Sequence, residues 1–410
     1  MTNWFEVDKD GLAKLQGGKP KVYILRELIQ NAWDENIKEC EVLLQLESNG
    51  RIRVTVIDDS PEGFRDLADS FTLFKETYKR DDPKKRGRFN LGEKQAIARC
   101  DWAYIATTKG TVIFDKNGRH TKRTTRTKGS LVEVIFDGTK QEFDEILTTV
   151  KNYLPPKGIK FLVNGETIPS REPLKVITAN LTTENNENGV FKRTARNTEV
   201  HIHKPDETAY LYEMGIPVTP IECKYGIDVQ QKIPLGVDRE SVPESYLKDV
   251  YAEVLNAMAD DLKEEDVSGT WVRLGSEDER VQESALRQVI KTRYGTKVVV
   301  ANPFDKVSID DAISHGYKVV HGSEMSKDEW GRVREFKLIS SSSEVFGHSF
   351  ASAVRYEPDG NMIKVAELSK RVAKRFMSTT ITVQFIKSSA TIAASYGPDT
   401  KVLTDRKSVV

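Results

Sequence analysis

The Asn49-Gly50 pair constrains the fold of this chain more than any other short feature. It joins two runs in which apolar and polar residues alternate, 41–48 and 51–59. An Asn-Gly pair between such runs is the strongest short-range signal of a β-hairpin. The spacing of apolar residues predicts helices at 21–39, 63–74, 91–100 and 142–154, and strands at 102–108, 111–115 and 130–137. We therefore expect an α+β sandwich, with helices on one face of a mixed, mostly antiparallel sheet.

Two breaks divide the predicted elements into three domains. Pro155-Pro156 ends the first domain, residues 1–155. The second domain, 156–265, combines strands with a closing amphipathic helix and ends in a polar acidic stretch. The third, 266–410, contains a small βαβ-like unit at 296–322. Because the last six residues break the preceding strand-like pattern, we expect a truncated or altered C-terminus.

The net charge of the chain does not indicate a particular class of binding partner. The 62 Lys and Arg residues balance 62 Asp and Glu residues, so net charge favours neither nucleic acid nor a membrane. The three cysteines form no CxxC pair, which fits a reducing compartment. The N-terminus lacks an apolar secretory segment, and no apolar run reaches the roughly 18 residues that span a bilayer. We predict a cytoplasmic protein.

The first predicted helix carries a polar stripe among apolar neighbours. Glu27, Asn31 and Asp34 stand at positions i, i+4 and i+7 and so share one helix face. A carboxylate can polarise a water molecule, and a carboxamide one turn away can offer a neutral oxygen to Mg²⁺. The alternative is a solvated polar face with no chemical role.

A second motif, DDSPEGF, follows the predicted strand at 51–59. Asp58 and Asp59 end the strand, and a turn leads to Gly63. A carboxylate at this place can accept a hydrogen bond from an exocyclic amine, and glycine lets the backbone approach closely. The alternative is an ordinary β-turn with an N-capping aspartate.

A third motif, RGRFNLGEKQA at 86–96, places glycines just before a predicted helix. Free backbone amides and the helix dipole favour phosphate there, and basic side chains add positive charge. The residues concerned are Arg86, Gly87, Arg88, Phe89, Asn90, Leu91, Gly92 and Lys94. The alternative is a glycine loop that only turns the chain. The segment before it, 75–88, is basic and polar, contains Pro83 and is predicted to be a mobile loop.

In this order and at these gaps, the three motifs resemble those of the GHKL ATPases, the Bergerat-fold superfamily. ELIQNAWDE resembles the N box, DDSPEGF the DxGxG box, and GRFNLG the lid glycine box. GSLVEV, 129–134, resembles a late strand whose hydroxyl supports the adenine-binding aspartate, with Ser130 in that place. The match covers about residues 20–137 and is nearest in pattern to the heat-shock protein 90 class and to orphan phage and bacterial members.

The resemblance implies ATP and Mg²⁺ as cofactors and a role for each matched residue. Glu27 would be the general base and Asn31 the Mg²⁺ ligand. Asp59 would bind the adenine amino group, since Gly63 lies four residues on, with Asp58 as the adjacent alternative. The remaining nucleotide-binding positions would be Asp34, Gly63, Gly87, Phe89, Asn90, Leu91, Gly92, Lys94 and Ser130, beneath the 75–88 loop acting as an ATP lid. Pro61 and Asn90 depart from the family, because glycines are usual there.

A fourth segment, PLGVDRES at 234–241, resembles part of the heat-shock protein 90 middle domain. Arg239 matches an arginine that reaches the γ-phosphate, where a cation neutralises developing charge. Lys232 is the competing candidate, because gyrase and MutL proteins use a lysine from a similar loop. The alternative for Arg239 is a salt bridge with Glu240 or Glu244.

These resemblances imply an ATPase whose clamp closes and reopens to remodel a macromolecular partner. The predicted role is chaperone-like, with a transducer-like second domain, a protein client rather than DNA, no membrane partner, and dimerisation of the chain when ATP binds. The alternatives are a DNA-transaction ATPase of the MutL or topoisomerase kind and a non-hydrolysing ATP-binding adaptor. His201 and His203, with no Cys or acidic partner in the motif, are interpreted as structural rather than as a metal site.

Overall fold

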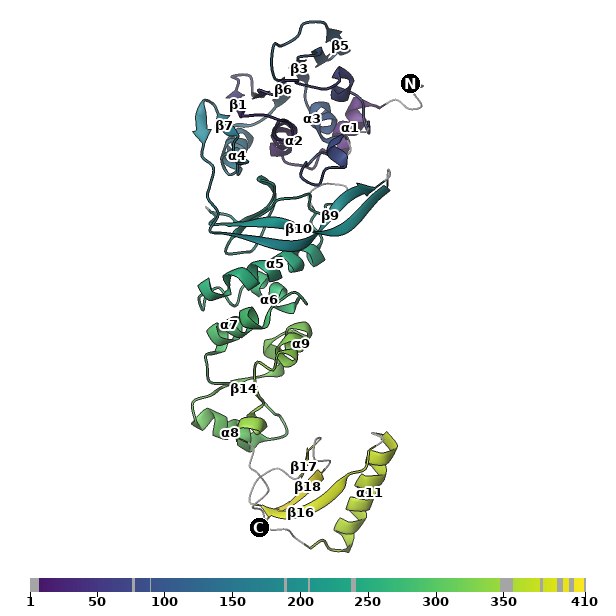
Figure 1. Ribbon diagram of the computed structural model, residues 1–410, viewed down its shortest axis with the longest axis vertical. Helices are drawn as coiled ribbons and strands as arrows, with labels where there is room; N and C mark the ends of the chain where they lie inside the picture. Colours follow the sequence, from purple (N-terminus) through teal and green to yellow (C-terminus); the bar gives the residue numbers. More distant parts are fainter. Residues whose placement is uncertain are drawn as a thin grey trace. The chain divides into compact units, whose positions relative to one another are not determined.

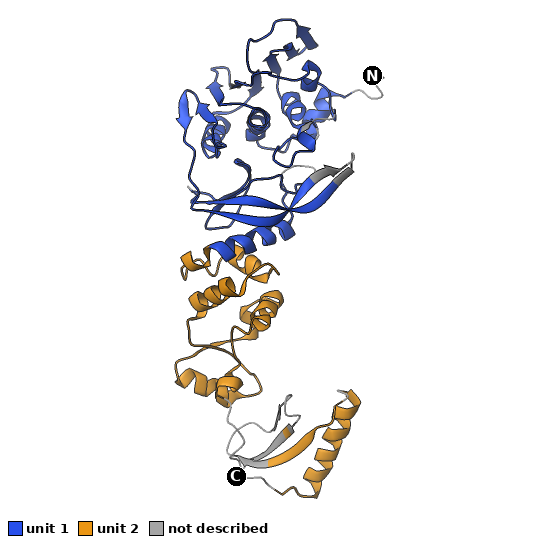
Figure 2. Ribbon diagram, viewed as in Figure 1, with its two compact units in different colours: residues 1–257 blue, residues 258–410 orange. Residues whose placement is uncertain are grey.

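The computed structural model of the chain consists of two compact units, residues 1–257 and 258–410 (Figure 2). It describes residues 7–75, 78–88, 90–187, 190–205, 207–236, 241–346, 357–376, 379–388, 394–397 and 402–408. The predicted boundary at Pro155-Pro156 lies inside the first unit, and the boundary between the units falls at Ala257, within the last turn of a helix. Among the described residues, no helix is both long and apolar enough to cross a membrane.

The first unit begins with an eight-stranded sheet of order β5-β4-β3-β6-β2-β1-β7-β8 (Figure 1). Its strands are β1 (Glu39–Leu46), β2 (Arg51–Asp58), β3 (Trp102–Thr107), β4 (Gly110–Asp115), β5 (Gly118–Lys122), β6 (Leu131–Asp137), β7 (Lys160–Val163) and β8 (Glu166–Ile168). Neighbouring strands are antiparallel except for β1 and β7. The predicted hairpin is confirmed, because Leu46 pairs with Ile52 and Gly50 adopts a φ of 77° in the turn.

Helices cover one face of this sheet, as the alternation of β1 requires. The helices are α1 (Lys9–Leu15), α2 (Val22–Trp33), α3 (Gly92–Ala98) and α4 (Lys140–Lys151), with short 3-10 helices η1 (Leu67–Ser70) and η2 (Tyr78–Arg80). Val42 and Leu44 are buried in the core that contains α2, whereas Leu43 on the opposite face is 39% exposed. Trp33, at the end of α2, packs edge-on against Phe161 with ring centroids 5.1 Å apart. The predicted α+β fold is therefore confirmed.

The predicted helix at 63–74 is wrong. Only η1 is helical there, and Asp66 caps it by accepting a hydrogen bond from the Ala68 amide. The Asn90 side-chain amide donates to the Thr72 carbonyl at 2.8 Å, so part of this backbone finds its partner in another segment. Phe64 and Phe71 still pack against the core. The spacing of apolar residues correctly indicated that these two side chains are buried. It did not indicate the backbone conformation, which follows from hydrogen bonds to other segments.

A second, five-stranded sheet of order β12-β11-β13-β10-β9 completes the first unit. Its strands are β9 (Lys175–Glu187), β10 (Val190–His203), β11 (Tyr210–Glu213), β12 (Ile216–Pro220) and β13 (Gly226–Val229), and α5 (Glu244–Met258) follows them. Figure 1 shows β9 and β10 as a long ribbon beside α5. Alternating apolar residues predict strands at 199–204, 207–215 and 227–237, which overlap the end of β10, β11 and β13, but no such pattern marks β9, whose residues are mostly polar.

The second unit contains η3 (Ala259–Asp261), α6 (Thr270–Glu277), α7 (Glu283–Tyr294), β14 (Val298–Val300), α8 (Lys306–Ser314), β15 (Lys318–Val320), η4 (Gly322–Glu324), α9 (Lys327–Glu335), α10 (Ser342–Phe346), α11 (Gly360–Phe376), β16 (Thr382–Ser388), β17 (Ala394–Gly397) and β18 (Val402–Ser408). The predicted βαβ-like unit is confirmed, because β14 and β15 pair in parallel on either side of α8. The expectation that the last six residues break the strand pattern is wrong for residues 405–408, which belong to β18, and the last two residues lie outside the described residues.

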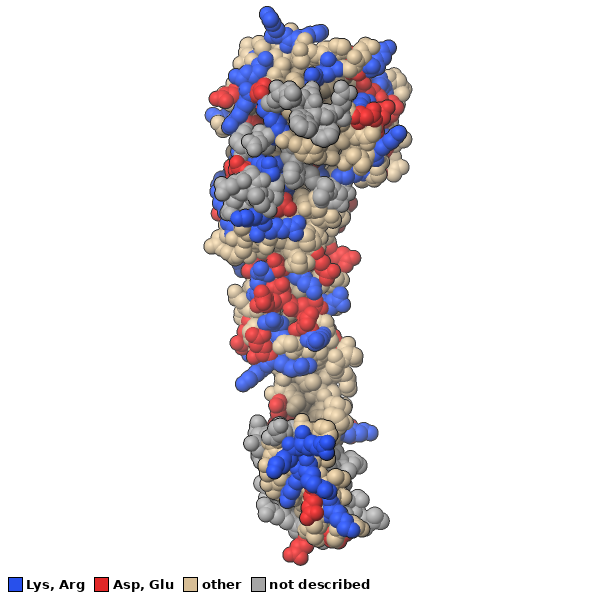
Figure 3. All heavy atoms as spheres, turned by 90° about the vertical axis from the view of Figure 1, so that its right-hand side faces the viewer, with Lys and Arg blue, Asp and Glu red and all other residues tan. Residues whose placement is uncertain are grey.

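Charged side chains are unevenly distributed over the second unit. On the face in Figure 3, Lys and Arg gather where α11 lies. The exposed basic residues of this helix are Lys364, Lys370, Arg371, Lys374 and Arg375. The balanced net charge therefore hides a local basic surface.

Candidate functional site

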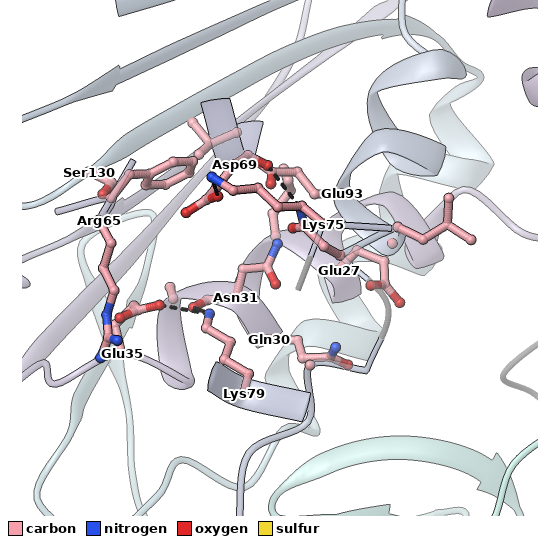
Figure 4. Close-up of a pocket in the computed structure, with 18 of the residues that line it drawn as sticks. Glu27, Gln30, Asn31, Glu35, Arg65, Asp69, Lys75, Lys79, Glu93 and Ser130 are labelled. Atoms are coloured by element: carbon pink, nitrogen blue, oxygen red, sulfur yellow. Dashed lines mark hydrogen bonds and ion pairs between the residues drawn. The ribbon is translucent and has the colours of Figure 1, made fainter. Parts of the chain in front are cut away.

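A cavity of about 550 Å³ lies in the first unit among α2, β2, the start of β6 and the segment that precedes α3 (Figure 4). Its volume falls within the roughly 300–1,000 Å³ of small-molecule sites. Eight of the predicted site residues line it, namely Glu27, Asn31, Asp58, Gly87, Asn90, Leu91, Gly92 and Ser130. The structure thus brings together the three sequence motifs and the start of the late strand.

One wall of the cavity is the polar stripe of α2. The helix buries Leu25 and Ile29 in the core, and Glu27 and Asn31 line the cavity one turn apart. Glu27 is 8% exposed, and its Oε1 lies 3.9 Å from a guanidinium nitrogen of Arg26. A carboxylate and a carboxamide therefore face the same enclosed space.

Asp34, the third residue of the stripe, has a different position. It is the C-cap of α2, does not line the cavity, and accepts hydrogen bonds from the amides of Arg86 and Gly87 at 3.1 and 2.9 Å. Burial alone would raise the pKa of Asp34, but the charges of Arg86 and Lys79 and these two amides hold it below its usual value. Asp34 therefore positions the glycine motif and makes no direct contact with the cavity.

Asp58 lines the cavity next to Val56 and Val132, whereas the preferred Asp59 does not line it. Side chains alternate along β2, so Val56 and Asp58 both face the cavity. The Asp58 Oδ1 accepts hydrogen bonds from the amides of Ser60 and Ser130 at 2.9 and 3.2 Å. Burial raises the pKa of Asp58, although these two amides partly oppose the effect.

Asp59 points away and binds backbone next to β1. It accepts hydrogen bonds from the amides of Lys38 and Glu39 at 2.8 and 3.0 Å and pairs with Lys128 at 3.1 Å. The sequence-based preference for Asp59 rested on Gly63 lying four residues further on, whereas in the structure Asp58 is the one of the two that lines the cavity. Gly63 itself does not line the cavity; its φ of 59° belongs to the turn that follows β2.

The glycine motif forms another part of the cavity wall. Gly87, Asn90, Leu91 and Gly92 line it, and Asn90 has a φ of 51°, a left-handed conformation that asparagine tolerates better than most residues. Asn90 therefore adopts a backbone conformation that is more often found at glycine. Lys94 does not line the cavity. Its Nζ donates to the Asn90 Oδ1 at 2.9 Å, and burial lowers its pKa.

Cations that the sequence analysis did not assign also line the cavity. They are Arg65, Lys75 and Lys79, together with Arg88, which had been noted only as positive charge in the third motif. Lys75 pairs with both Asp66 and Asp69 at 2.6 Å, and Lys79 pairs with Glu35 at 2.7 Å (Figure 4). Lys75, Lys79 and Arg88 belong to the segment predicted to be a loop, and Arg65 to the segment predicted to be a helix. In neither segment did a basic residue give a signal that distinguished it from a solvated one.

The lid segment, residues 75–88, is anchored to the second sheet through Arg88 and Arg86. Arg88 is 3% exposed and pairs with Glu213 at 2.5 Å and Glu184 at 2.9 Å. Burial alone would lower the pKa of Arg88, yet these two carboxylates raise it above its usual value. Arg86 pairs with Asp34 at 2.9 Å and donates to the carbonyls of Glu213 and Met214.

Lys232 lies against the lid backbone and does not line the cavity. Its Nζ donates to the carbonyls of Lys79 and Arg80 at 2.7 and 2.8 Å, and its amide donates to the Pro83 carbonyl at 2.9 Å. Burial, followed by the charge of Arg88, lowers the pKa of Lys232 to about 8. Arg239 and Phe89, both predicted site residues, lie outside the described residues.

Replacing Arg88 with Met is expected to destabilise the first unit by about 3–5 kcal/mol, because it leaves the buried Glu213 carboxylate without its cation. Urea unfolding of the full chain measures the change. Arg193→Met is the matched control, because Arg193 also pairs with Glu184, at 3.7 Å, but from an exposed position. Its effect is expected within about 0.5 kcal/mol. Equal effects of the two variants would contradict the anchoring role of Arg88.

No known protein family matches the chain, and no curated protein does. Among solved structures, the ATPase region of Saccharomyces cerevisiae topoisomerase II aligns over 55% of this chain and 78% of that one, with 14% sequence identity and a TM-score of 0.35. A structural similarity with so low a TM-score and sequence identity assigns no residue of this chain a role.

Proposed function

We propose that the chain is an ATP-binding protein of the GHKL type that hydrolyses ATP with Mg²⁺ in this cavity. The observation that carries the proposal is the polarity of the cavity. A hydrogen-bonded carboxylate, Asp58, lies next to the paired Val56 and Val132 on the cavity wall, and cationic side chains and the glycine motif also line the cavity. An adenine base needs the first kind of group, and a triphosphate needs the second.

The residues present fit an adenine nucleotide and its cation. Asp58 would accept a hydrogen bond from the adenine amino group, while the Ser130 amide orients its carboxylate. Asn31 would offer its carboxamide oxygen to Mg²⁺, which supplies charge neutralisation at the phosphates. Glu27, one turn away, would accept a proton from the attacking water.

The lid contacts support a coupling between hydrolysis and the second sheet. Arg88 and Lys232 hold the lid segment to residues of that sheet, so a shift of the lid on nucleotide binding would pull on these strands. Arg239 remains the proposed source of a cation for the γ-phosphate, and Lys232 is proposed as a positioning residue for the lid.

We propose a protein client and a chaperone-like clamp, as the PLGVDRES segment suggests, with dimerisation of the chain when ATP binds. The alternative, a DNA-transaction ATPase, is favoured by one observation, the exposed basic residues of α11. Phosphate backbones bind such surfaces through a salt-dependent electrostatic attraction.

ATP turnover by the full chain tests the proposal, measured with Mg²⁺, with a chelator, and with added double-stranded DNA. We expect turnover that requires Mg²⁺ and is unchanged by DNA. Stimulation by DNA that disappears at high salt would favour the alternative. Tight ATP binding without turnover would reject hydrolysis and leave the non-hydrolysing adaptor.

A further inference from the structure

Two histidines and one aspartate gather on one face of the second sheet, away from the residues assigned to ATP. His201 and His203 are two residues apart on β10 and so point to the same face. His201 lies directly opposite Asp228 on the antiparallel strand β13. One potential ligand atom from each of the three residues lies within 4.8 Å of the other two.

His203 is buried, and its ring nitrogens lack hydrogen-bond partners among the described residues. It is 5% exposed. A buried polar atom without a partner costs free energy, so such groups call for a ligand, an ion or a water molecule. The lone pair of a neutral imidazole is a strong ligand for a transition metal.

The other two residues are already oriented by neighbours. His201 Nε2 lies 3.1 Å from the Glu199 carboxylate, an arrangement that leaves Nδ1 available as a ligand. The Asp228 carboxylate accepts hydrogen bonds from the Gln230 side chain at 2.6 Å and from the Gly215 amide at 2.7 Å. Metal-bound histidines and carboxylates in proteins are held by outer contacts of this kind.

The strands that carry these residues are firmly packed. Val200, Ile202, Ile227 and Val229, which alternate with the cluster, are each at most 1% exposed. Sites built on packed strands hold their geometry better than sites on loops. A small movement of side chains, rather than of backbone, would bring three ligand atoms around one cation.

We propose that His201, His203 and Asp228 bind one divalent transition-metal cation of the Zn²⁺ class. Two imidazole nitrogens and one carboxylate oxygen suit Zn²⁺ and leave a fourth position for water. Mg²⁺ and Ca²⁺ prefer oxygen ligands and fit this set poorly. The structure thus supplies the acidic partner that the sequence interpretation of His201 and His203 lacked.

The cation would also stiffen the turn to which the lid segment is anchored. Asp228 holds the Gly215 amide, and the neighbouring Met214 carbonyl accepts a hydrogen bond from Arg86. The Gly215 carbonyl accepts one from the Leu154 amide at 3.0 Å. Binding of the cation is therefore expected to raise the thermal midpoint of the full chain.

The test is a Zn²⁺ titration of the full, tag-free chain after chelator treatment, in the presence of a chromophoric competitor and without nucleotide. A Cys223→Ser background removes the one cysteine that is not buried. We expect one Zn²⁺ per chain, little competition from Mg²⁺, and at least about tenfold weaker binding for His203→Ala and Asp228→Asn. Co²⁺ should report the same site by its visible absorption.

His120→Ala is the matched control, because His120 forms an exposed pair with Asp115 at 3.2 Å that resembles the pair of His201 with Glu199. His201→Gln, at a partly exposed position, serves if His203→Ala fails to fold, as judged by circular dichroism. Zn²⁺ binding that is absent in the wild-type chain, or equal in the cluster variants and the control, would overturn the proposal. ATP binding is measured separately, so either proposal can fail alone.

Discussion

Glu27→Gln is expected to reduce ATP turnover by about 10²–10⁴-fold while the chain still binds ATP. Glutamine keeps the size and hydrogen-bonding reach of the side chain but cannot accept a proton at neutral pH. Because Glu27 is 8% exposed and lines the cavity, its carboxylate is shielded from bulk water but faces the enclosed space. Steady-state turnover and equilibrium ATP binding, measured on the same preparation, separate the two effects.

Glu93→Gln is the control for position, because Glu93 also lines the cavity but lies on α3 beside Lys94, at 3.4 Å. We expect it to retain most of the turnover. If Glu27→Gln turned over ATP at the wild-type rate, Glu27 would not be the general base. A parallel loss of ATP binding would instead assign Glu27 to ground-state binding.

Asp58→Asn is expected to weaken ATP binding by about 10–100-fold, because a hydrogen bond to a charged group contributes about 1.5–3 kcal/mol. The amide oxygen can still accept a hydrogen bond from the adenine amino group, but without the charge, and its own NH₂ group can face the wrong way. Direct titration with ATP, and with GTP for comparison, measures the loss. The preference for adenine over guanine should fall with it.

Asp59→Asn is a stringent control, since the exchange is identical and the residue is adjacent. Its side chain binds the amides of Lys38 and Glu39 and does not line the cavity. We expect ATP affinity within about twofold of the wild-type value, which corresponds to less than 0.5 kcal/mol. A larger loss for Asp59→Asn than for Asp58→Asn would restore the sequence-based assignment and refute the structural one.

Much of the ATP-site proposal follows from local patterns. The hairpin around Gly50 was predictable because turn chemistry and strand alternation are encoded within a few residues. The shared face of Glu27 and Asn31 was predictable because a helix repeats every 3.6 residues. Asn90 was flagged as a departure from glycine, but its left-handed φ of 51° needed the structure.

Other features depend on contacts between distant residues, for which no local pattern exists. Arg88 donates a hydrogen bond to Glu213, which lies 125 residues away in the sequence. Lys232 donates one to the carbonyl of Lys79, which lies 153 residues away. His201 and Asp228 meet only because β10 and β13 pair in one register. Which residue on a strand faces a partner is decided by that register, and a shift of one residue exchanges the two faces.

The sequence by itself therefore determined the α+β class, the hairpin, the polar stripe of α2 and the ordered motifs, because each arises from the geometry of a single segment. Only the tertiary structure distinguished the positions of Asp58, which lines the cavity, and Asp59, which binds backbone amides. It also placed Lys232 on the lid backbone and brought Asp228 beside His201. These outcomes come from packing between segments far apart in the chain, where burial and hydrogen-bond pairing set the positions of side chains.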